Sequence, residues 1–225
     1  MNSLKRRVVM NWGARFVVLS AFLFIPANSL AFPRAWAFLA VYFLPQAWMV
    51  GYFLRTDPKF VERRLKLGPG AETRTRQKLV MKLVILCFFV SIMIAGFDHR
   101  FGWSQVSVSV SMAGYVGMLI GIGIQFRVFV ENSFASATIE IAADQRVIAT
   151  GPYAFLRHPM YSGALFTDCC IPLALGSWWA FLPLAVKVPV IVLRLLDEEE
   201  FLRANLSGYA EYCQKVPHRL IPAIW

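Results

Sequence analysis

The sequence predicts an all-α, polytopic membrane protein with four membrane-spanning helices followed by a C-terminal helical hairpin. Hydrophobic residues fill 58% of the 225 positions and charged residues only 16%, whereas a soluble domain carries about 25% charged residues. Long apolar runs alternate with short basic segments. The net charge is +10, but so apolar a chain offers few exposed faces for cations. This argues against a soluble enzyme and against a nucleic-acid-binding protein.

Four charge-poor runs have the length of a single crossing, about 20 residues. They are Phe16–Pro33, Ala35–Leu54, Leu79–Phe97 and Phe101–Phe126. The first run could be a cleaved signal peptide, because Lys5, Arg6 and Arg7 precede it. It is longer than the usual apolar core of a signal peptide, and a second span follows almost at once. We therefore expect it to remain as a membrane helix.

The fifth apolar run, Pro159–Leu193, is too long for one helix and has Gly176-Ser177 near its middle. It predicts a hairpin of two short arms over residues 159–196. Asp168 and Lys187 are the charges inside this run, and the turn places them at similar depth on facing arms. We expect them to pair, because a lone ion in hydrocarbon is costly. Alternatively, either residue lines a polar cavity.

The loop charges indicate an orientation. With a cytoplasmic N-terminus, the outer loops carry only Arg34 and Arg100, and the other basic segments face inward. This asymmetry matches the positive-inside rule. We expect both termini in the cytoplasm, in a multi-pass protein of the bacterial inner membrane. The chain then divides into an N-terminal transmembrane part, residues 1–103 with a cytoplasmic loop at 55–78, and a core at 104–225. The core comprises a span, a loop at 127–160, the hairpin and a C-terminal cytoplasmic segment.

Two familiar kinds of site are not predicted. The four cysteines form no C-x-x-C pair and no cluster with histidine, so we expect neither a metal site nor a disulfide framework. Gly117, Gly121 and Gly123 superficially resemble a nucleotide-binding fingerprint, but no strand precedes them and they lie inside a span. Small residues four apart favour close helix packing instead. No Rossmann domain is expected.

The segment after the core loop combines a turn with a helix start. Gly151-Pro152 is typical of a turn, and Pro159 disfavours the helical conformation at His158 while suiting the first turn of a helix. Arg157 and His158 should therefore lie at the mouth of the fifth membrane helix. Free backbone N–H groups there attract anions.

Two tyrosines, Tyr153 and Tyr161, bracket this helix mouth. Aromatic faces can stack on a heterocycle or contact a cation. The same residue types are also ordinary anchors at the headgroup boundary of a membrane. The residues alone leave both interpretations open.

Four consecutive acids, Asp197 to Glu200, follow Arg194 at the expected end of the last arm. Arg194 and Glu198 are spaced i, i+4 and share a helix face. Acids at a helix C-terminus oppose the macrodipole, so a cationic partner would explain them. A solvated helix end with one local ion pair is the simpler alternative.

Taken together, four motifs resemble the isoprenylcysteine carboxyl methyltransferase family and its phospholipid methyltransferase relatives. They are G-P-Y-x-x-x-R-H-P-x-Y-x-G at Gly151–Gly163, R-x-x-x-E-E at Arg194–Glu199, G-Y-x-x-Y at Gly208–Tyr212 and R-L-I-P at Arg219–Pro222. The resemblance covers about residues 110–225. It implies a membrane methyltransferase that uses S-adenosyl-L-methionine, held in a cytoplasmic pocket between the core loop and the C-terminal segment.

The resemblance also assigns roles by position. The cofactor contacts would be Gln145, Arg146, Val147, Ile148, Tyr153, Arg157, His158, Pro159, Met160, Tyr161, Glu198 and Glu199. The catalytic group would be Arg194, His158 and Glu199, with Arg194 on the acceptor side and no metal. The register between Glu198 and Glu199 is open by one residue. Gln145 departs from the histidine typical of eukaryotic members, which concerns the acceptor more than the cofactor.

The expected partners are the lipid bilayer and a lipidic or small hydrophobic methyl acceptor, with no nucleic acid. The acceptor would enter from the bilayer between the fourth and fifth spans. The alternatives to carboxyl methylation are phospholipid N-methylation, thiol S-methylation, and a non-catalytic membrane protein of the same fold.

Overall fold

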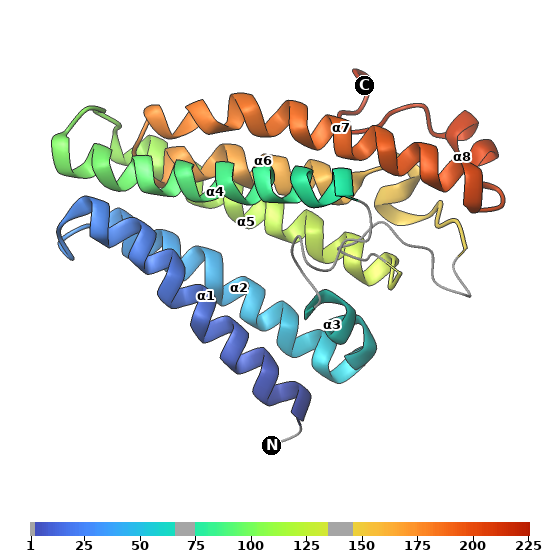
Figure 1. Ribbon diagram of the computed structural model, residues 1–225, viewed down its shortest axis with the longest axis horizontal. Helices are drawn as coiled ribbons and strands as arrows, with labels where there is room; N and C mark the ends of the chain where they lie inside the picture. The colour runs from blue at the N-terminus through green and yellow to red at the C-terminus, as the bar shows by residue number, and fades with distance from the viewer. Residues whose placement is uncertain (1–2, 66–74, 135–145) are drawn as a thin grey trace.

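The computed structural model describes residues 3–65, 75–134 and 146–225, and these residues form helices, turns and loops without a strand (Figure 1). The long helices are α1 (Ser3–Ala27), α2 (Pro33–Thr56), α4 (Thr75–Phe101), α5 (Val108–Glu131), α6 (Pro159–Leu175) and α7 (Leu182–Asn205). The short elements are α3 (Pro58–Leu65), η1 (Gly151–Ala154), η2 (Trp179–Phe181) and α8 (Tyr209–Lys215). The all-α prediction is confirmed.

Within the described ranges, five helical segments are long and apolar enough to cross a membrane. They are α1, α2, α4, α5 and Trp179–Asn205. The arm α6 is shorter, with 17 residues. Proline sets several helix starts, because its missing N–H would be unpaired at that position anyway: Pro33 begins α2, Pro58 begins α3 and Pro159 begins α6. The expected hairpin turn is confirmed at Gly176, whose φ of 77° ends α6 in the left-handed conformation.

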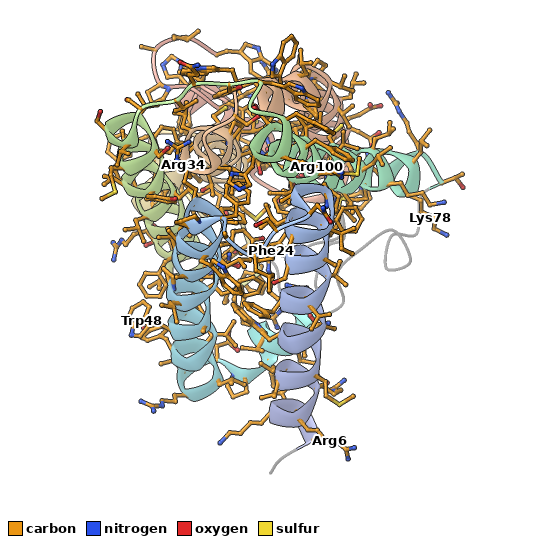
Figure 2. The ribbon with its side chains drawn as sticks, turned by 90° about the vertical axis from the view of Figure 1, so that its left-hand side faces the viewer. Arg6, Phe24, Arg34, Trp48, Lys78 and Arg100 are labelled. Atoms are coloured by element: carbon orange, nitrogen blue, oxygen red, sulfur yellow. The ribbon has the colours of Figure 1, made fainter. Side chains whose placement is uncertain are left out.

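The helices form two parts that diverge from one another. Helices α4, α5, α6 and α7 lie side by side, and the α1–α2 hairpin packs against them obliquely (Figure 1). In Figure 2 the hairpin descends from these helices, and Arg6 marks its far tip. The two parts meet closely where α1 passes α4: a Cβ on Gly96 would approach Leu23 O to 2.6 Å. We call this end, which carries the turns around Arg34, Arg100 and Gly176, the turn end, and the opposite end the α8 end.

Three predicted boundaries are wrong. Residues 16–33 were expected to form the first span, but α1 begins at Ser3 and ends at Ala27, so Arg15 lies in the middle of a helix. The expected loop at 55–78 contains α3 and the first turn of α4. The second hairpin arm continues beyond residue 196 to Asn205, so the acids from Asp197 to Glu200 lie inside α7 and not at its C-terminus.

Helices α5 and α6 make the most extensive contact between any two of the described helices. A Cβ on Gly117 would collide with the Cys170 side chain, and one on Gly121 with the Thr167 side chain, so the predicted packing role of these glycines is confirmed. Gly123 faces open space and takes no part. The two backbones approach closely around Gly114 and Gly121, and the expected entry of an acceptor between these helices stays a prediction.

The expected ion pair of the hairpin is also present. Lys187 Nζ lies 2.6 Å from Asp168 Oδ2, and the ammonium is 5.3 Å from the ring centroid of Phe88. Both charged side chains are largely shielded from solvent. The pair joins α6 to α7 midway along the hairpin.

The α5–α6 contact yields a first prediction. Gly121→Val should lower the stability of the protein in detergent by about 1–3 kcal/mol, the usual cost of overpacking, because its side chain has no space against Thr167. Gly123→Val is the matched control, since it makes the same change on the same helix at an open position. The measurement is the apparent melting temperature of both variants. Equal melting temperatures would contradict the packing role.

The ion pair yields a second prediction. Asp168→Lys and Lys187→Asp should each reduce the yield of folded protein, because each leaves two like charges facing one another inside the hairpin. The double variant restores opposite charges and should recover folded protein. Monodispersity after size-exclusion chromatography measures the outcome, and no recovery in the double variant would show that the pairing is not what matters.

Candidate functional site

The expected site residues gather at the α8 end, where the start of α6, the last turns of α7 and the C-terminal segment meet (Figure 1). The backbone N–H of Arg157 donates to His218 O at 3.0 Å, and that of His158 donates to Arg219 O at 3.1 Å. Ser162 Oγ donates to Leu220 O at 2.7 Å. Arg157, His158 and Ser162 thus attach the start of α6 to residues 218–220, where the R-L-I-P segment begins.

Glu199 is the centre of the charges at this junction. Its Oε1 accepts from Arg157 Nη1 at 2.9 Å and lies 3.3 Å from His158 Nε2. Its Oε2 accepts from Arg219 Nε at 3.1 Å and lies 3.7 Å from Arg203 Nη2. The carboxylate is buried, so its charge is balanced by these groups and not by water.

Arg157 is buried and fully engaged by the protein. Besides Glu199, its Nε donates to Val216 O at 2.7 Å and its Nη2 to Pro217 O at 2.7 Å. These bonds join the turn before α6 to the segment after α8. The geometry gives Arg157 a positioning role, and its expected contact with a ligand stays a prediction.

A second polar network lies beside the first and connects α4, α6 and α7. Tyr161 Oη donates to Glu198 Oε2 at 2.7 Å and accepts from Arg194 Nε at 3.0 Å. Arg194 Nη1 donates to Gln77 Oε1 at 2.8 Å, and Gln77 in turn donates to Asp197. Arg194 and Gln77 are buried, whereas Glu198 is partly accessible. Of the two neighbouring acids, Glu198 is therefore better placed than the buried Glu199 to receive a cation.

The turn before α6 is held by tyrosines. Tyr212 Oη of α8 donates to Tyr153 O at 2.8 Å, and Tyr153 Oη accepts from Asn132 Nδ2 at 3.0 Å. Burial raises the pKa of the Tyr153 phenol to about 12, so it stays protonated at neutral pH. The two hydrogen bonds fix η1 between the end of α5 and α8, and Tyr153 forms part of the protein surface around the start of α6.

Tyr209 carries an unpaired polar atom. Within the described part of the chain, its buried hydroxyl has no hydrogen-bond partner. Burial raises its pKa well above the usual value, and the nearby charges of Glu199 and Glu198 raise it further. The hydroxyl is thus a protonated donor near the two acids. A buried donor without a partner costs free energy unless something binds it.

The structure unites most of the residues expected from the sequence. Arg157, His158, Tyr161, Glu198 and Glu199 lie in connected networks, with Arg194 joined through Tyr161. Val147 packs on the apolar face of α8, and Arg146 and Ile148 flank it without helix or strand structure. Gln145 lies outside the described residues. The described residues contain no group of acids, histidines and cysteines that could hold a metal ion.

Sequence reasoning missed three residues of this region: Gln77, Arg219 and Tyr209. The glycine-tyrosine and arginine motifs containing Tyr209 and Arg219 were visible, but they did not reveal what the side chains contact. Gln77 lies among cations at the start of α4 and carries no local signal at all. Its role depends on α7, which lies far along the chain.

A cavity of about 660 Å³ opens between the α1–α2 hairpin and the other long helices. Its wall is mostly apolar and includes Trp12, Phe43 and Phe88. At the α8 end it reaches Tyr161 and Arg194, so it borders the second network directly. The volume lies within the range of small-ligand sites, roughly 300–1,000 Å³.

Comparison with known proteins bears on these motifs. Residues 110–207 match the family model described as phospholipid methyltransferase. The resemblance inferred from the motifs is confirmed over this part of the chain, which includes the R-H-P and E-E motifs. Helix α8 and the R-L-I-P segment lie beyond it. The family is one of methyltransferases, and the five candidate spans support an integral membrane protein.

A relative from Mus musculus, the Delta(14)-sterol reductase TM7SF2, is 28% identical over 91 residues. The aligned part is 39% of this chain and 22% of that relative. The chain thus spans about a fifth of the length of the curated relative it matches, and the likeness extends to a protein whose name describes a different reaction.

The Glu199 cluster yields a third prediction. Glu199→Gln should destabilise the protein by about 3–5 kcal/mol, because it leaves buried Arg157 without its anion. Glu200→Gln, one residue further along α7 and exposed, is the control and should change stability by less than about 0.5 kcal/mol. Apparent melting temperatures in detergent measure both. A stable Glu199→Gln protein would exclude the structural role of this carboxylate.

Proposed function

We propose that the protein is an S-adenosyl-L-methionine-dependent methyltransferase of the isoprenylcysteine carboxyl methyltransferase type, acting on a lipidic or small hydrophobic acceptor at the membrane. The observation that carries the proposal is the junction of the R-H-P and E-E motifs beside a mostly apolar cavity. The family match over residues 110–207 supports it.

The residues at the junction fit the chemistry of this cofactor. Glu198, partly accessible and bonded to Tyr161, is suited to its ammonium or sulfonium charge. The unpaired Tyr209 hydroxyl offers a donor near both acids. Val147 and Tyr153 suit an adenine ring, which binds between apolar faces. When bound, the cofactor supplies an activated methyl group.

The chain's own residues would then align the acceptor and exclude water, the main tasks in a displacement at an activated carbon. The Glu199 cluster holds the cofactor side rigid through Arg157 and His158. A carboxylate acceptor needs a cation to position it and no base. An amine or thiol needs deprotonation, for which His158 or a glutamate is the candidate.

We also propose that the α8 end faces the cytoplasm of a bacterial cell. Arg34 and Arg100 belong to the turn end, whereas the basic N-terminus, α3 and α8 belong to the other. This distribution is the one that the positive-inside rule associates with a cytoplasmic α8 end. The cofactor would then be reached from the compartment that contains it.

Cofactor titration tests the proposal. The purified protein should bind S-adenosyl-L-methionine, and Glu198→Gln should weaken binding at least tenfold, because it removes the anion that receives the cofactor's positive charge. Glu200→Gln is the control on the same helix and should bind as the wild type does. Isothermal titration calorimetry measures the affinities, and melting temperatures confirm that the variants are folded.

No heat of binding for the wild type would overturn the proposal. Because the mouse relative is named a reductase, a nicotinamide cofactor is titrated in parallel, and binding of that cofactor alone would favour reduction. A radiolabelled-methyl assay in native lipid extract then identifies the reaction. A base-labile product indicates an ester, and a stable one indicates N- or S-methylation.

A further inference from the structure

Arg64 of α3 is a cation for which the described part of the chain supplies no counter-charge. Its guanidinium lies 4.5 Å above the ring of Phe129, and Nη1 is 3.8 Å from Met160 Sδ. Across the described residues, no carboxylate lies within ion-pair distance of it. Burial lowers its pKa to about 10, so it remains charged at neutral pH. A partly buried cation held by an aromatic face and a sulfur atom is available to an anion.

Arg15 is a second cation of this kind. It lies mid-way along α1, in the part of the helix that faces the cavity, and among the described residues it has no acidic partner either. Arg15 is close enough to Arg64 that its charge lowers the pKa of Arg64 further. Two cations from different helices therefore approach one another, and no described acid lies between them to balance the charge.

Both arginines line the 660 Å³ cavity, whose charged residues are mostly cations. Of its other charged residues, Lys187 is paired with Asp168 and Arg194 is bonded to Tyr161 and Gln77. The remaining wall is largely apolar. Among the described residues, Arg15 and Arg64 are thus the charges of the cavity that have no charged partner, and Arg64 contacts Met160 at the start of α6.

We propose that the cavity binds an amphiphile with an anionic group, which Arg64 and Arg15 hold while the hydrocarbon lies between the α1–α2 hairpin and α4. This rests on the proposed function only in taking the amphiphile to be the methyl acceptor. It assigns the acceptor's anion to Arg64 and not to Arg194, whose guanidinium is already engaged within the protein. It also gives the N-terminal helices and α3 a role in recognition.

Binding of a brominated fatty acid tests the proposal without any methylation. Bromine quenches indole fluorescence on contact, and Trp12 lies in the cavity wall. The dissociation constant obtained from the quenching should be at least tenfold lower for the acid than for the brominated fatty alcohol of the same chain length. Trp12→Phe should lose most of the quenching. Equal affinity of acid and alcohol would overturn the role of the charge.

Charge variants locate the site. Arg64→Gln should weaken binding of the acid at least tenfold and leave the alcohol unchanged, Arg64→Lys should retain part of the affinity, and Arg15→Gln should lose some. Arg63→Gln is the matched control on α3, because Arg63 bonds to Ser133 O and lies near Asp57, outside the cavity. Equal losses in Arg63→Gln and Arg64→Gln would indicate a general charge effect and overturn the proposal.

Thermal unfolding separates this role from a structural one. Without ligand, Arg64→Gln should melt no lower than the wild type, since it removes an uncompensated cation, and it should lose the stabilisation that the fatty acid gives the wild type. A lower melting temperature without ligand, with ligand stabilisation intact, would overturn the proposal.

The two proposals fail separately. In the methylation assay, Arg64→Gln should raise the KM for the acceptor and leave the Kd for S-adenosyl-L-methionine unchanged. A raised cofactor Kd with an unchanged acceptor KM would assign Arg64 to the cofactor carboxylate and overturn the inference while the proposed function stands. Binding of the fatty acid without cofactor binding would overturn the proposed function alone.

Discussion

The buried Glu199 carboxylate is the interaction on which the site depends. It lies on α7, yet its partners come from the turn before α6, from α7 itself and from the C-terminal segment. A buried charge is tolerated only when its partners are held in place, so these segments are fixed relative to one another by electrostatics as much as by packing. The neighbouring acid, Glu198, can remain partly accessible because Glu199 takes the structural role.

The two neighbouring acids thus differ in their surroundings, because Glu199 is buried among protein partners and Glu198 is partly accessible. The arginines differ in the same way. Arg157 and Arg194 are enclosed by protein partners, whereas Arg15 and Arg64 line the cavity and pair with none of the described acids. Polar groups that are already paired specify the fold, and groups left unpaired at a cavity are available to a ligand. The second kind occurs where the N-terminal hairpin faces the other helices.

Much of the fold was predictable because it depends on local properties. Run length and charge depletion indicate the membrane helices, and Gly176 marks the turn through its backbone conformation. The Asp168–Lys187 pair followed from depth alone. The end of α7 was not predictable in this way, because the cost of acids near its last turns is offset by partners from distant segments.

The sequence indicates which residues belong to the site, but it does not indicate what each of them contacts. The motifs brought together Arg157, His158 and the two glutamates, but which acid is buried depends on tertiary packing. Arg15 was read as a span boundary because charge interrupts an apolar run, yet a long arginine side chain can extend from a helix toward a polar region. Gln77 and Arg64 have roles only because other helices approach them.

The α1–α2 hairpin contacts α4 closely at Gly96, near one end of the hairpin. Helix α1 has 25 residues, about 37 Å at 1.5 Å per residue, and near its turn end Leu23 O faces Gly96 of α4 closely. A small rotation about that contact moves the distant part of the hairpin furthest. Helix α3 lies at that part, because it follows α2 directly and its Glu62 pairs with Arg7 of α1. The width of the cavity between the hairpin and α4 is therefore geometrically linked to the tilt of the hairpin, and tilting is one way in which a membrane helix adapts to the thickness of the bilayer.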